Sequence, residues 1–260
     1  MRMSDVFKAT DCERTFDPAP LVLKQSHKPG GFQFVPVSDL EFREPEFVVA
    51  DLLETETLAM LFGDPGCGKS FIAVDVALSV ATGTPFHGRD TRAASVFYIA
   101  GEGHNGLARR FAAWAKARRV PTKDAPLFVS NRPAQFLDKA SARDVSQAVR
   151  KLADEHGPPG LIVVDTVARN FGGGDENSTQ DMAKFVAAMD ELKATWPGCT
   201  VLLVHHSGHA DKGRARGAMA LKGALDAEFR AQKADGVIEL SCTKMKDAPP
   251  PSDAFFRLDT

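Results

Sequence analysis

The residues from Gly63 to Ser70 hold the strongest chemical pattern in the chain. They fit the spacing G-x-x-x-x-G-K-[ST] at every fixed position. Glycines let backbone N–H groups approach a phosphate, and a helix that starts at the loop adds its positive end. In such a loop Lys69 reaches the β- and γ-phosphates and the Ser70 hydroxyl ligates Mg²⁺, so ATP with Mg²⁺ is the expected ligand. The expected contacts are Gly63, Asp64, Pro65, Gly66, Cys67, Gly68, Lys69, Ser70 and Phe71.

A second carboxylate-bearing segment fits the same site. Residues 161–164 are four apolar residues, as in a buried strand, and Asp165 follows them directly. A carboxylate at the end of such a strand holds Mg²⁺ through water in phosphate-loop enzymes. Many buried strands end in aspartate, but the pattern is much more specific when it follows a phosphate loop, so we expect Asp165 to be a metal ligand.

The general base is predicted elsewhere, because Thr166 and not an acidic residue follows Asp165. Glu102 comes directly after the apolar run 96–100 and is positioned to orient water on the γ-phosphate. The competing interpretation of Glu102 is an ordinary solvated loop residue.

The elements that must position these residues alternate between strands and helices from residue 47 onward, which predicts an α/β fold. We expect residues 1–45, rich in proline and in both signs of charge, to form an extended arm, and residues 46–260 to form one domain. Helices are expected at 71–81 and 105–119 and after caps at Ser141 and Ser178. Strands are expected at 58–62, 95–100, 127–129, 161–164, 200–204, 237–242 and 254–258.

Composition narrows the class of protein. The 260 residues carry 32 Lys and Arg against 34 Asp and Glu, a net charge of −2, so no overall cationic field draws the chain to polyanions. No apolar run approaches the length of a membrane span, and the first residues lack the apolar core of a signal peptide. The four cysteines are scattered and are expected to be reduced thiols. These features favour a cytoplasmic protein without a membrane partner.

The segments FYIAGEGH (97–104) and LLVHHSGH (202–209) resemble the RecA-like branch of P-loop ATPases, which includes the DnaB-type and plasmid RepA-type hexameric helicases. The resemblance implies a mostly parallel sheet with helices on both faces and antiparallel C-terminal strands. It also implies that His206, or else His205, contacts the γ-phosphate. A zinc site of His205, His206 and His209 is the rival interpretation, but adjacent histidines on a strand point to opposite faces. A plain structural histidine pair is the other.

The same resemblance implies two DNA-facing loops, 168–178 and 207–219. The second, extended through Lys222, has a local charge of +3 because four cations outnumber Asp211. Those cations are Lys212, Arg214, Arg216 and Lys222. In the first loop at most Arg169 and Phe171 would contact a DNA strand. A flexible solvated loop with incidental cations is the alternative.

Two further features have counterparts in this family. Lys244 and Lys246 resemble the K-x-K or K-x-R signature that a subunit inserts into its neighbour's ATP site, unless they are an ordinary charged turn. Arg110 is placed similarly to an arginine that packs on adenine in RepA-type proteins.

These features together predict an ATP-hydrolysing, ring-forming helicase or translocase of the RepA type, acting on single-stranded DNA in plasmid or phage replication. The expected assembly is a homo-oligomer, a hexameric ring. A filament-forming recombination or annealing ATPase is the second interpretation, and a KaiC-like regulatory ATPase is the third. The arm does not resemble the helical collar of DnaB-type helicases, which weakens the expectation of helicase activity more than that of ATPase activity.

Overall fold

The computed structural model describes residues 34–40, 44–101, 103–208 and 212–258. The chain divides into two units, Met1–Glu44 and Pro45–Thr260. In the first unit the described residues include a short 3-10 helix, Val37–Asp39, without buried residues. The second unit holds the sheet, the helices that cover it and all the candidate site residues.

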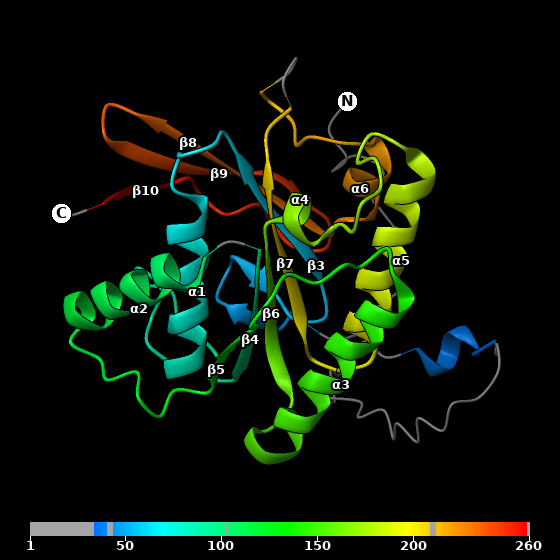
Figure 1. Ribbon diagram of the computed structural model, residues 1–260, viewed down its shortest axis with the longest axis horizontal. Helices are drawn as coiled ribbons and strands as arrows, with labels where there is room; N and C mark the ends of the chain where they lie inside the picture. Colours follow the sequence, from blue (N-terminus) through cyan, green and yellow to red (C-terminus); the bar gives the residue numbers. More distant parts are fainter. Residues whose placement is uncertain (1–33, 41–43, 102, 209–211, 259–260) are drawn as a thin grey trace, which may run out of the picture. The chain divides into compact units, whose positions relative to one another are not determined.

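Within the described residues the main sheet has eight strands in the order β10-β9-β8-β3-β7-β6-β4-β5 (Figure 1). All pairs from β8 to β5 are parallel, whereas β9 runs antiparallel to both β8 and β10. A small antiparallel pair, β1 (Phe47–Val49) and β2 (Leu53–Glu54), lies outside this sheet. The strands of the main sheet are β3 (Leu58–Gly63), β4 (Ser95–Ala100), β5 (Leu127–Val129), β6 (Pro159–Asp165), β7 (Thr200–His206), β8 (Ala227–Ala234), β9 (Val237–Met245) and β10 (Ala254–Arg257). The predicted mostly parallel α/β fold is confirmed.

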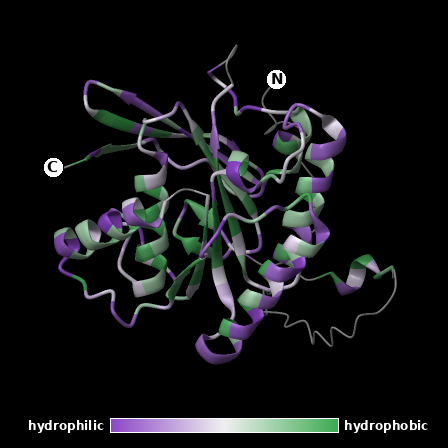
Figure 2. Ribbon diagram, in the orientation of Figure 1, coloured by the Kyte–Doolittle hydropathy of each residue, from purple (hydrophilic) through white to green (hydrophobic). Residues whose placement is uncertain are grey.

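Helices cover both faces of this sheet (Figure 1). One face packs against α1 (Lys69–Thr82) and α2 (His104–Arg118), and the other against α3 (Lys139–His156), α5 (Thr179–Ala194) and α6 (Met219–Ala224). A single turn, α4 (Val167–Asn170), follows β6. Because both faces are covered, the central strands are apolar at nearly every position, as their hydropathy shows (Figure 2).

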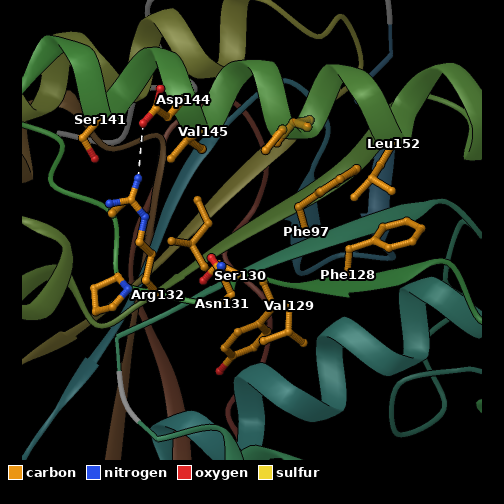
Figure 3. A pocket seen from close by; sticks show the side chains of 16 residues that line it. Phe97, Phe128, Val129, Ser130, Asn131, Arg132, Ser141, Asp144, Val145 and Leu152 are labelled. Atoms are coloured by element: carbon orange, nitrogen blue, oxygen red, sulfur yellow. Dashed lines mark hydrogen bonds and ion pairs between the residues drawn. The ribbon is translucent and has the colours of Figure 1, made fainter.

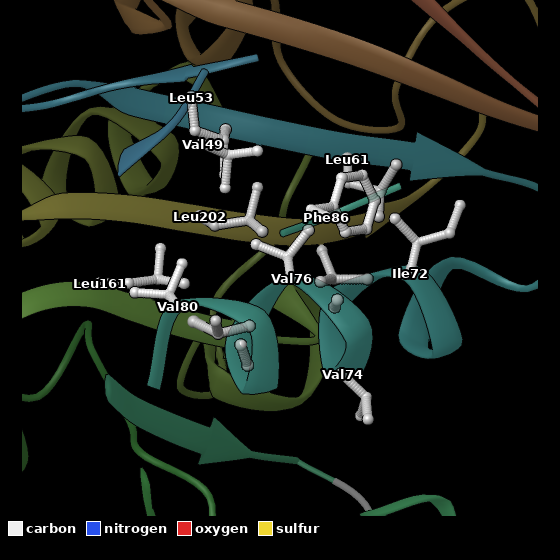
Figure 4. Close-up of a cluster of buried hydrophobic side chains, with 14 of the residues drawn as sticks. Val49, Leu53, Leu61, Ile72, Val74, Val76, Val80, Phe86, Leu161 and Leu202 are labelled. Atoms are coloured by element: carbon white, nitrogen blue, oxygen red, sulfur yellow. The ribbon is translucent and has the colours of Figure 1, made fainter. Parts of the chain in front are cut away.

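Alternation along the strands decides which side chains meet α1. Leu161 and Leu202 belong to the cluster beneath α1 (Figure 4), together with Val163 and Val204. The residues between them, Ile162, Val164, Val201 and Leu203, belong to the cluster on the opposite face. By the same period of two, Asp165 and His206 lie on the α1 face and His205 on the other.

Two local features differ from the sequence predictions. Helix α3 begins earlier than expected, because Asp138 is its cap and accepts from the Ala140 amide at 2.9 Å. The predicted cap at Ser141 is therefore wrong. The cap at Ser178 is confirmed, since its hydroxyl accepts from the Asp181 amide. Strand β8 was missed, although Asp235 and Gly236 join it to β9 with positive φ angles of 51° and 78°, an Asp-Gly hairpin turn.

Candidate active site

The loop between β3 and α1 is shaped by two glycines. Gly66 and Gly68 adopt positive φ angles of 76° and 103°, which favour glycine. A Cβ at Gly66 would meet only open space, whereas one at Gly68 would strike the Ile238 side chain on β9. The loop therefore keeps its concave backbone bare at the N-terminus of a 14-residue helix, as an anion site requires.

Lys69 is folded back over this loop. Its ammonium donates to the carbonyl oxygens of Gly63 at 2.9 Å and Asp64 at 2.8 Å, and the residue is only 5% exposed. Burial lowers the pKa of Lys69, while the nearby charges of Cys67, Asp165 and Asp64 act in the opposite direction. A buried cation close to Asp165 is thus ready to exchange carbonyl oxygens for phosphate oxygens.

Asp165 ends β6 on the α1 face and is 7% exposed. The hydroxyl of Tyr98 donates to its Oδ2 at 2.5 Å, and the amide of Gly101 donates to its backbone carbonyl at 2.6 Å. Tyr98 fixes the orientation of the carboxylate, a role that the sequence analysis missed. The sequence contains a signal for this role, because Tyr98 is the single tyrosine of the chain and stands two residues before the end of a neighbouring buried strand.

The two adjacent histidines have different environments. His206 is half-buried and stands opposite Gly63, the first residue of the phosphate loop, in the β3–β7 pairing. His205 is fully buried on the other face, where its Nε2 donates to the Arg216 carbonyl at 2.9 Å. Burial lowers the pKa of His205 to about 4, so its ring is neutral near pH 7. The described residues contain no group of three potential metal ligands, and His209 lies outside them.

Glu102 also lies outside the described residues, so its role as general base stays a prediction. The strand before it is well placed, because Ala100 pairs with Asp165 in the β4–β6 register.

Arg110 and Phe71 come together on the same side of the loop. The guanidinium carbon lies 4.7 Å from the centre of the Phe71 ring, and Phe71 is 40% exposed. Asp75 joins the two helices by accepting from Trp114 Nε1 at 2.6 Å. A flat cation on an aromatic ring beside the phosphate loop offers a surface on which a nucleobase can stack.

Three of the four cations proposed for DNA are paired with carboxylates. The ion pairs are Lys212 with Asp64 at 2.9 Å, Arg216 with Glu176 at 3.2 Å and Lys222 with the fully buried Glu228 at 3.2 Å. Among the residues described, Arg214 has no carboxylate partner and donates to the Gly217 carbonyl at 3.3 Å. The charge of +3 counted along the sequence therefore overstates what this segment presents to a polyanion.

Lys244 and Lys246 lie at the opposite edge of the sheet from the phosphate loop. Lys244 is near the end of the antiparallel strand β9 and pairs with Glu228, and Lys246 follows the strand directly. Met245, between them, pairs with Ala227, which in turn pairs with Ala59 near the start of β3. The structure does not bring them to the phosphate loop of their own chain, so the role predicted for them requires a second subunit.

An apolar cavity of about 490 Å³ lies between α3 and strands β4 and β5 (Figure 3). Phe97, Val145 and Leu152 line it, and an ion pair of Arg132 with Asp144 at 3.2 Å lies at one end. Phe97 faces away from α1, so this cavity is separate from the phosphate loop.

The bare loop at the end of β3, the buried lysine and the carboxylate two strands away define a RecA-like P-loop NTPase. The model of the AAA_25 family, described as an AAA domain, matches residues 27–212. Since this is more than half of the chain, the protein belongs to that family. No curated protein matches the sequence. Among the described residues no helix is long and apolar enough to cross a membrane.

Proposed function

We propose that the protein hydrolyses ATP with Mg²⁺ at the phosphate loop. The observation that carries this proposal is the placement of Lys69, Asp165 and His206 at the carboxyl edge of three adjacent strands, on the face covered by α1. The donor set fits the ligands, because the bare loop and Lys69 suit phosphate, and the Ser70 hydroxyl with Asp165 suits Mg²⁺. Bound Mg²⁺ would offset the charge of the β- and γ-phosphates.

The chain's own residues supply the remaining chemistry. Lys69 exchanges its two carbonyl contacts for phosphate oxygens, and Tyr98 holds the carboxylate of Asp165 in place. Glu102 is the base that orients the attacking water, and His206 contacts the γ-phosphate. Lys244 and Lys246 of a neighbouring subunit stabilise charge on the transferred phosphoryl group. Arg110 and Phe71 hold the adenine.

We further propose that ATP hydrolysis drives a ring, a hexamer by family resemblance, that acts as a helicase or translocase on single-stranded DNA. The segments after β6 and β7 both start at the carboxyl edge of the sheet and contact each other, since the Ala218 amide donates to the Glu176 carbonyl at 2.9 Å. We expect DNA to contact Arg214 first, because the other three cations must leave a carboxylate before they can bind DNA.

The test is ATP hydrolysis with and without single-stranded DNA, paired with electron microscopy of the same samples. We expect DNA to stimulate hydrolysis and the particles to be closed rings, with the Lys69→Ala variant as an inactive control. Filaments on DNA would favour a recombination or annealing ATPase. A rate of hydrolysis that single-stranded DNA does not change would favour a regulatory ATPase.

A further inference from the structure

The carboxylate of Asp64, in the phosphate loop, holds the segment that follows β7. Its Oδ1 accepts from the Ser207 hydroxyl, and its Oδ2 accepts from Lys212 Nζ at 2.9 Å. The amide of Ser207 also donates to the Gly63 carbonyl at 3.0 Å. The hydrogen bonds from Lys212 and Ser207 lower the pKa of Asp64, so its carboxylate is charged near pH 7. One side chain of the phosphate loop thus carries the only charged contact between the described parts of these two segments.

Contacts continue from this segment to the one after β6. The Nε of Arg216 lies 3.2 Å from Oε2 of Glu176, whose side chain is 9% exposed. The backbone carbonyl of Arg216 accepts a hydrogen bond from the buried His205. A Cβ at Gly217 would press against the Glu176 carbonyl, so the backbones pack closely there. Residues 212–218 therefore join the phosphate loop at one end to Glu176 at the other.

Lys212 also lines a cavity with the phosphate loop. This cavity measures about 450 Å³ and is walled by residues 63–67, Lys212 and residues 230–233 at the end of β8. The side chain of Lys212 is 67% exposed, so little packing restrains its ammonium apart from the bond to Asp64. A nucleoside triphosphate in the adjoining cradle brings several negative charges, against one on Asp64, and so competes for this ammonium.

We propose that Lys212 distinguishes ATP from ADP: it leaves Asp64 for the terminal phosphate of ATP and returns to Asp64 when that phosphate is gone. The inference rests on the proposed ATP site and adds a specificity-determining residue to it. Asp64 is then the competitor that holds Lys212 in the ADP-bound and nucleotide-free states. Residues 212–218 transmit the change in the position of Lys212 towards Glu176.

The experiment measures dissociation constants for a non-hydrolysable ATP analogue and for ADP, each with Mg²⁺. The readout is the ratio of the ADP constant to the analogue constant, because contacts to the parts that the two nucleotides share change both constants alike. Lys212→Ala should lower this ratio about tenfold, the size of one charge-assisted hydrogen bond. Asp64→Asn should raise it, since the competitor is removed and Lys212 remains. The double variant should behave as Lys212→Ala.

Lys233→Ala is the matched control, because Lys233 lines the same cavity and is exposed. Its ratio should equal that of the wild type. The inference is overturned if Lys212→Ala leaves the ratio unchanged, or if Asp64→Asn lowers it, as loss of a merely structural ion pair would do. A loss confined to oligonucleotide binding would make Lys212 a DNA contact and would also overturn it. The proposed ATP site fails separately, if Lys69→Ala binds the analogue as the wild type does.

Discussion

Two lysines of this protein are held in the same manner at opposite edges of one sheet. Lys69 donates to the carbonyl oxygens of Gly63 and Asp64 at 2.9 and 2.8 Å. Lys244 donates to those of Lys222 and Leu225 at 2.9 and 2.5 Å. Both ammonium groups thus depend on main-chain oxygens, yet only one of them is placed for chemistry within its own chain.

The difference lies in what the carbonyl groups belong to. Those around Lys244 lie in the last turn of α6 and at its C-cap residue, where a helix leaves carbonyl oxygens without partners, so Lys244 serves as a cap. Those around Lys69 precede α1, where free N–H groups attract anions, and the Gly63 carbonyl keeps the Ser207 amide when Lys69 leaves. A lysine on carbonyl oxygens is therefore exchangeable or structural according to which end of a helix it serves.

The strongest test of this contrast is Lys69→Ala beside Lys244→Ala. We expect Lys69→Ala to abolish hydrolysis and sharply weaken ATP binding, because the cation on the β- and γ-phosphates is lost. Lys244→Ala should bind ATP as the wild type does. Equilibrium binding and steady-state hydrolysis of the two purified variants decide the matter. Hydrolysis by Lys69→Ala near the wild-type rate would contradict the assignment of the phosphate loop.

The contrast sharpens when binding is separated from hydrolysis. Glu102→Gln should keep Mg²⁺-ATP binding and lower the hydrolysis rate about 10²–10⁴-fold, since the amide keeps the shape of the side chain but cannot accept the proton. The measurement is single-turnover hydrolysis beside nucleotide affinity. Normal turnover would move the role of base to another carboxylate.

A mixing experiment tests whether Lys244 and Lys246 act between subunits. A double variant with Lys244→Ala and Lys246→Ala should bind ATP yet hydrolyse it poorly. Mixed with Lys69→Ala subunits, it can place its intact phosphate loop against intact lysines from a neighbour. Activity should partly return. A mixture that stays inactive, although mixed oligomers are shown to form, would contradict a role in trans.

Lys246→Ala alone is the cleaner partner in that mixture. The side chain of Lys246 is 60% exposed and its ammonium lies 3.4 Å from Asp226, so its loss leaves the cap on α6 intact. If the single variant reproduces the hydrolysis defect and the rescue, Lys246 carries the role and Lys244 supports the fold.

The sheet was largely predictable because its strands are continuous apolar runs between turns, and such runs mark buried parallel strands. Strand β8 was not predicted, because charged and polar residues interrupt its apolar pattern. Glu228 and Arg230 read as surface residues, yet Glu228 is fully buried against Lys222, a pairing across six residues that no local pattern shows. The Asp-Gly turn after β8 was the signal that could have revealed it.

In the site, the sequence predicted residue types at strand ends but not their partners. Strand alternation separated His206 from His205, and the structure places them accordingly. The Tyr98–Asp165 and Lys212–Asp64 contacts join residues 67 and 148 positions apart. They depend on the strand order. Local sequence patterns predict neither that order nor which surface charges will pair. The local charge of the second loop was overestimated for the same reason.

The smallest expected effect concerns stability and separates the two lysines in the opposite direction from activity. Lys244→Met should lower the free energy of unfolding by about 1 to 2 kcal/mol, because carbonyl oxygens at the C-terminal end of α6 lose a charged donor. Lys246→Met should change it by less than about 0.5 kcal/mol, as expected for an exposed ion pair. Lys69→Met should be neutral or stabilising, since it removes a buried charge whose pKa is already lowered by burial. Urea unfolding of the three variants measures these differences. A Lys69→Met variant less stable than Lys244→Met would mean that Lys69 is itself structural, and the contrast between the two lysines would fail.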